Sequence, residues 1–149
     1  MTKQEKYNLA KWAMNHALEN GAQQASVIIS NNRSSSVDVR DQKIDKLEQA
    51  IQSNLTVRLF VDKKYSVHST NRLKKEELAR FIKEAIAGTR YLSEDEFRTL
   101  PDPSHYFKGE QKDLKTQDSG FYNHKKKKKI DLAFQAENEV LGKDNRIIS

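Results

Sequence analysis

The sequence predicts a two-layer α+β domain in which helices cover one face of an antiparallel sheet. Two segments, residues 2–20 and 74–88, carry apolar residues at helical spacing. Between them, residues 25–69 contain short stretches in which apolar and polar residues alternate, as in strands that bury one face. We expect about five strands from these stretches. The short turns favour antiparallel pairing, and a mixed sheet remains an alternative.

The first predicted helix, residues 2–20, has a recognisable start and end. Thr2 and Glu5 have the spacing of a capping box, in which each residue satisfies a backbone N–H of the other. Gly21 follows at a position that commonly takes positive φ after a helix. The residues expected to form its buried stripe are Ala10, Ala13, Met14, Ala17 and Leu18.

The first strands are predicted as a hairpin of residues 25–31 and 34–40, joined by a tight turn at Asn31, Asn32 and Arg33. Residues 43–53 fit a helical pattern as well as an extended one. Their position between short strands favours a strand, because a helix would need longer connections on both sides.

The clearest alternation lies in residues 54–61, and Asp62–Lys64 is predicted as the hairpin turn that follows them. Residues 65–69 continue the sheet with Tyr65 and Val67, and we expect His68 to point outward. The residues of 54–61 expected to face the helices are Leu55, Val57, Leu59 and Val61.

The second predicted helix starts with Glu76 and Glu77, whose charges suit a helix N-terminus, and Gly88 is expected to follow its end. Its predicted buried residues are Leu78, Phe81, Ile82, Ala85 and Ile86. The chain then divides into a core domain (1–90), a polar loop that could be partly disordered (91–129), and a final part (130–149). That part reads as a helix, 130–141, and the first residues of a further strand, which suggests truncation.

The basic character of the chain is local. The net charge is +6, from 27 basic and 21 acidic residues, and five lysines are consecutive. Without those five, 22 basic residues oppose 21 acidic ones, so the rest of the chain is nearly neutral. The run is a candidate basic patch for nucleic acid or an acidic partner, but a solvated run is favoured. Its residues are Lys125, Lys126, Lys127, Lys128 and Lys129.

Several chemistries lack their usual residues. The chain has no cysteine, so disulfides, thiolate metal sites and a cysteine nucleophile are excluded. No apolar stretch approaches the length of a membrane helix, and the N-terminal residues do not resemble a signal peptide, so we expect a cytoplasmic protein. There is no nucleophile elbow and no phosphate-binding glycine loop.

The four histidines do not form a zinc-protease motif. Such a motif places two histidines on one helical face with a glutamate beside them. No histidine here is followed by glutamate, and no pair has i, i+4 spacing. A site assembled from distant residues stays open but is disfavoured, so we assign no catalytic, cofactor-binding or metal residue. The histidines are His16, His68, His105 and His124.

Three segments in order resemble the N-terminal part of TldD/PmbA-family proteins, also called modulators of DNA gyrase. The first is ALENGAQQASVIISNNRSSSVDVRDQKIDKLEQA, the second VRLFVDKKYSVHSTN, and the third EDEFRTLPDPSHY. Most of residues 9–103 is covered, and the helix at 130–141 is matched more weakly. The sequence departs from the family at four positions where glycine is usual: Asn54, Thr56, Lys63 and Ser66.

The resemblance implies a bacterial, cytoplasmic metallopeptidase system that degrades or trims peptides. TldD-type members carry a zinc motif in the second half of a longer chain, whereas PmbA-type members lack it and partner them. We therefore expect the non-catalytic N-terminal domain of such a protease, shaping the substrate chamber and a homo- or heterodimer. Zinc is expected only in the missing C-terminal part, if the protein is of the TldD branch. Whether the protein is itself an enzyme stays open.

Three arginines are candidates to face a peptide if strand alternation places them on the open side of the sheet: Arg33, Arg40 and Arg58. Ordinary surface arginine is the favoured reading. Two further functions stay open: a nucleic-acid-binding module that uses the lysine run, and a purely structural interaction domain. The sequence leaves the family branch, the natural substrate and any role of gyrase undecided.

Overall fold

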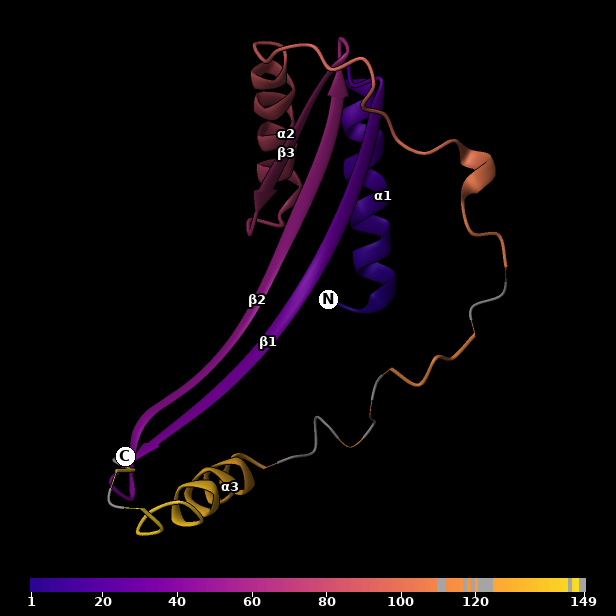
Figure 1. Ribbon diagram of the computed structural model, residues 1–149. Helices are drawn as coiled ribbons and strands as arrows, with labels where there is room; N and C mark the ends of the chain where they lie inside the picture. The colour runs from indigo at the N-terminus through magenta and orange to yellow at the C-terminus, as the bar shows by residue number, and fades with distance from the viewer. Residues whose placement is uncertain (110–111, 117, 119, 121–124, 145, 148–149) are drawn as a thin grey trace. The chain divides into compact units, whose positions relative to one another are not determined.

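The computed structural model describes residues 1–109, 112–116, 118, 120, 125–144 and 146–147. Its sheet has three strands in the order β1-β2-β3 (Figure 1). The elements are α1 (Lys3–Glu19), β1 (Gln24–Arg40), β2 (Lys43–Val61), β3 (Lys64–Thr70), α2 (Lys75–Thr89), a 3-10 turn (Pro103–His105) and α3 (Lys126–Asn138). The α+β class is confirmed, but the described sheet has three strands rather than about five.

Fewer strands are present because two predicted pairs are each one long strand. β1 continues through Asn31, Asn32 and Arg33, so the turn expected there is wrong. β2 likewise joins 43–53 and 54–61, and the strand favoured for 43–53 is confirmed. Every residue from 30 to 36 is exposed. A strand segment that buries neither face shows no alternation, so its polar residues look like a turn.

Both hairpin turns consist of two residues in the left-handed region. Asp41 and Gln42 have φ of 49° and 56°, and Asp62 and Lys63 have φ of 51° and 60°. Two positive φ angles are typical of the turn whose twist matches that of paired strands. The second turn is one residue shorter than expected, because Lys64 already pairs with Val61.

The chain forms two compact units, which are described separately. Unit 1 consists of residues 1–32 and 52–107, and unit 2 of residues 33–51 and 108–149. In unit 1, α1 and α2 lie beside the part of the sheet where β3 pairs with β2 (Figure 1). Both helices contribute to one apolar cluster with the strands, so the sheet of this unit is covered on one face.

The start of α1 is as predicted, but its buried face is rotated. Thr2 and Glu5 form the complete capping box. The residues buried along the helix are Leu9, Ala13 and Ala17, whereas Leu18 is 41% exposed. The buried stripe therefore includes Leu9 and excludes Leu18, and it is centred on Ala13.

The alternation in β2 is confirmed and that in β3 is corrected. Leu55, Val57, Leu59 and Val61 are all fully buried. In the antiparallel register, Leu59 lies opposite Ser66 and Val57 opposite His68. Paired residues share a face, so His68 lies on the core side rather than pointing outward. Val67 is 48% exposed on the other face.

The buried residues predicted for α2 are confirmed, with Phe81 half-buried against the core. The helix continues through Gly88 to Thr89, so Gly88 does not end it. Thr89 is fully buried, and its hydroxyl donates to the carbonyl of Ala85 at 2.7 Å. The hydroxyls of Thr89 and Ser66 are also hydrogen-bonded, which ties the end of α2 to β3.

Unit 2 combines the outer part of the β1–β2 hairpin, residues 33–51, with α3. Figure 1 shows α3 beside the Asp41–Gln42 turn, where the backbone N–H of Gln42 donates to Glu137 at 3.0 Å. α3 runs from Lys126 to Asn138 and so begins four residues before the expected Ile130. None of the described residues of unit 2 is buried.

Some expectations fall on other parts of the chain. Arg146 lies in a turn, where its guanidinium binds Asp144 at 2.6 Å, so the strand expected here does not begin at this residue. Ile148 and Ser149 lie outside the described residues, as do Phe121, Tyr122 and His124. No described helix has the length and apolar character needed to cross a membrane.

Candidate functional site

A concave surface of unit 1 lies at the turn end of the β2–β3 hairpin. This hairpin-end cleft has a volume of ≈ 240 Å³. It is lined by Gln23, Gln24, Phe60, Lys63, Asp95, Glu96, Arg98 and Thr99. Its walls therefore come from the start of β1, from the hairpin and from the loop that follows α2.

Paired hydrogen bonds fix the hairpin turn to the start of β1. The backbone N–H of Asp62 donates to the side-chain oxygen of Gln23 at 2.8 Å, and the Gln23 amide donates back to Asp62 at 3.3 Å. The N–H of Gln23 also donates to the carbonyl of Phe60 at 2.9 Å. Glutamine supplies both a donor and an acceptor, which suits this two-way pairing.

The loop after α2 is held at both ends. The N–H of Asp95 donates to the carbonyl of Lys63 at 2.8 Å. The Gln24 side-chain oxygen accepts from the Leu100 N–H at 2.9 Å and from the Thr99 hydroxyl at 2.8 Å. Part of the segment expected as a polar excursion thus packs on the core domain.

Charge and aromatic contacts complete the cleft. Arg98 pairs with Asp95 at 3.1 Å, and its guanidinium lies 4.7 Å from the ring centre of Tyr65. Tyr65 in turn packs on Phe60 with ring centres 5.0 Å apart. Arg98 and Asp95 are about half exposed, so the ion pair contributes less than about 1 kcal/mol. These contacts organise a surface and present no nucleophile beside a base.

His68 is the titratable side chain whose burial the sequence did not reveal. Its ring meets Phe81 edge-on with ring centres 6.3 Å apart, and its buried Nε2 has no hydrogen-bond partner among the described residues. Burial lowers the pKa of His68, which favours the neutral ring. The register of β3 against β2 places it there, because the two-residue turn pairs Val61 with Lys64 and so shifts the alternation by one residue, putting Ser66 and His68 on the core face.

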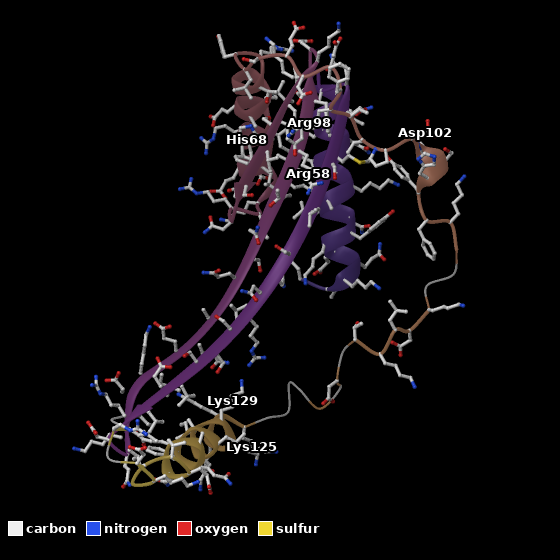
Figure 2. All side chains as sticks on the ribbon, viewed as in Figure 1. Arg58, His68, Arg98, Asp102, Lys125 and Lys129 are labelled. Atoms are coloured by element: carbon white, nitrogen blue, oxygen red, sulfur yellow. The ribbon has the colours of Figure 1, made fainter. Side chains whose placement is uncertain are left out.

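The three candidate arginines are divided between the two units. Arg58 is exposed on β2, on the face opposite Val57 and Leu59 (Figure 2). Arg33 and Arg40 belong to β1 in unit 2, whereas Arg58 belongs to unit 1. Within either unit, therefore, the three do not form a shared peptide-facing surface, and their role stays a prediction.

The lysine run begins α3. Lys125 is the N-cap residue, its side chain makes no capping hydrogen bond, and Lys126–Lys129 form the first turn (Figure 2). Positive charge near a helix N-terminus is unfavourable, because the N–H groups there already carry partial positive charge. The geometry suits a solvated helix end and adds no base-stacking surface among the described residues.

The metal expected for the family has no fitting donor set here. Within the described ranges, no three or more histidine, aspartate or glutamate side chains converge in a way that could hold a metal ion. His16 stacks on Trp12 with ring centres 5.2 Å apart, and His105 lies in the 3-10 turn, so both belong to separate surroundings. We derive no zinc chemistry from these residues.

Comparison with known proteins agrees with the resemblance in the sequence. Residues 25–88 match PmbA/TldA metallopeptidase domain 1. A crystal structure from Bacteroides thetaiotaomicron VPI-5482, described as a "putative modulator of DNA gyrase", is 45% identical with a TM-score of 0.90. The match covers 99% of this chain but 33% of that protein, and no curated protein matches. This chain therefore belongs to the TldD/PmbA family, of which it carries the N-terminal part.

Proposed function

We propose that this chain acts as the non-catalytic N-terminal domain of a TldD/PmbA-type metalloprotease that degrades or trims peptides. The observation that carries the proposal is the match of 99% of the chain to 33% of a longer solved protein at 45% identity. The described residues supply a packed sheet and an ordered cleft but no converging metal ligands. In the proposed division of labour, zinc and peptide cleavage belong to the rest of the polypeptide.

The domain would act by position. Unit 1 has a continuous apolar core, and both the hairpin turn and the following loop are tied to β1. Such a rigid body can form a wall of a substrate chamber and part of a dimer interface. Exposed arginines, including Arg58, would contact peptide carboxylates or carbonyls from that wall.

The non-catalytic part of the proposal is tested by metal content. In the full-length protein, we expect replacement of His16, His105 and His124 by glutamine to leave bound zinc and peptide-cleavage rates unchanged. Zinc is measured by atomic emission and cleavage with a fluorogenic peptide. Loss of zinc together with cleavage would show that this domain supplies ligands and would overturn the proposal.

The chamber role is tested by charge reversal. We expect Arg58→Glu with Arg40→Glu to lower kcat/KM for peptides while zinc content stays constant. Lys83→Glu on the exposed face of α2 is the control for each single reversal, because it changes one positive charge to a negative one away from the sheet. Equal rates for all three proteins would contradict a peptide-facing role for the arginines.

A further inference from the structure

The outer part of the β1–β2 hairpin is well formed but has no core of its own. We call residues 33–51 the ribbon. The ribbon residues are exposed or, at Val37 and Val39, half-buried. A two-stranded hairpin alone is marginally stable in water, because it buries too little apolar surface to offset the entropy of ordering. Such a hairpin gains stability from any partner that covers its apolar side chains.

The ribbon also exposes apolar side chains beside a hollow. Leu47 is 38% exposed and Ile51 is 68% exposed. Four residues apart in a strand, they project from the same face. A hollow of ≈ 520 Å³ lies on the ribbon and is lined by residues 34–36 and 47–50. Three of its lining residues are serines, so little side-chain volume fills it from β1.

The backbone of the ribbon has unused pairing capacity as well. β3 pairs with Leu55–Val61 of β2, so among the described strands β1 alone lies beside residues 43–54 of β2. Unpaired strand edges accept another strand readily, and natural proteins cover or charge them. The ribbon has charged residues such as the ion-paired Lys46 and Glu48, yet it keeps exposed Ile51 near them.

We infer that the ribbon is the docking surface for the C-terminal remainder of the full-length polypeptide, which covers Leu47, Ile51 and the hollow. The inference rests on the proposed function. The matched solved protein contains this fold at a TM-score of 0.90 over 99% of the chain, and the chain covers only 33% of that protein. That protein thus has about twice as much polypeptide again outside this fold, enough to supply apolar contacts to the ribbon.

The test uses trypsin on the full-length protein. The ribbon contains four cleavage points, Arg33, Arg40, Lys43 and Lys46, so mass spectrometry can follow its exposure directly. We expect the wild-type ribbon to resist cleavage, and Ile51→Asp to speed cleavage within it about tenfold, since a charge opposes burial. Gln52→Asp is the control, because it places the same charge on the adjacent exposed residue.

Equal cleavage of the wild type and both variants would overturn the inference. Protection that rises with protein concentration would also overturn it, since a second copy would then be the cover. If Ile51→Asp does not fold, Leu47→Asn provides a milder change on the same face. Zinc binding and peptide cleavage are measured separately, so failure of the proposed function would be distinguishable from failure of the docking.

Discussion

Unit 1 and unit 2 share two strands but differ in how their residues are buried. In unit 1, the side chains of α1, α2 and the strands form one cluster that includes the fully buried Leu59 and Ile82. In unit 2, none of the described residues is buried. Regular strands thus occur with and without a local core, so strand formation here does not by itself indicate local stability.

The largest expected effect separates the two units with one type of substitution. Leu59→Ala should lower the unfolding free energy of the 149-residue chain by about 3 kcal/mol, because it leaves a cavity in a closed core. Leu47→Ala in the ribbon should cost less than about 0.5 kcal/mol, because Leu47 is already exposed. Urea denaturation followed by circular dichroism measures both, and similar losses would contradict the contrast.

A smaller effect tests whether burial also determines how much a hydrogen bond between two hydroxyl groups contributes to stability. Ser66 bonds the buried Thr89, whereas Ser69 bonds Thr56 at 2.8 Å on the exposed side of the same hairpin. We expect Ser66→Ala to cost about 1 kcal/mol and Ser69→Ala much less, because water replaces the exposed bond. Thermal denaturation of the two variants gives the comparison, and a reversed order would count against it.

The two left-handed turns allow the same substitution to be compared in both units. Lys63→Gly should stabilise the chain by about 0.5 kcal/mol, since glycine adopts positive φ without a Cβ clash but loses more entropy on folding. Gln42→Gly changes the same conformation in unit 2 and should leave global unfolding almost unchanged. Urea midpoints of both variants measure this, and a larger shift for Gln42→Gly would show that unit 2 governs unfolding.

The weakest expected effect is a pH slope from His68 in unit 1. Burial holds its pKa below the ordinary 6.5, so the unfolded chain binds more protons around that pH. The stabilisation is complete above about pH 6.5 and is lost as the pH falls toward the lowered pKa. Thermal midpoints across this window should fall with pH, and His68→Phe should reduce the slope. If His16→Phe reduces the slope as much as His68→Phe does, the pH effect is not specific to His68.

Sequence reasoning succeeded where one face of an element is buried. The alternation of residues 54–61 and the helical spacing of 74–88 follow directly from packing against the core. The capping box at Thr2 involves residues only three positions apart, so it was also predicted from the sequence. The family was also identified from segments that lie mostly within unit 1.

Prediction failed where burial gives no pattern. Residues 30–36 of β1 are exposed, and their asparagines and serines are typical of turns, so a turn was wrongly predicted there. His68 was misplaced because the two-residue turn sets which face of β3 meets the core, and turn length is not visible in composition. The hairpin-end cleft was missed because Gln24 and Thr99 meet across 75 positions of sequence. No short motif records such a contact.

The two-residue turn at Asp62 and Lys63 limits how the length of this domain can vary. One inserted residue there would exchange the two faces of β3, turning Tyr65 and Val67 toward α2 and moving His68 and Ser66 into water. Length differences between related chains should therefore be rare at this hairpin and more frequent in the stretch after Phe107, where the described residues 108–109 and 112–116 are exposed. A reporter tag or cleavage site for following the intact protein belongs in that stretch.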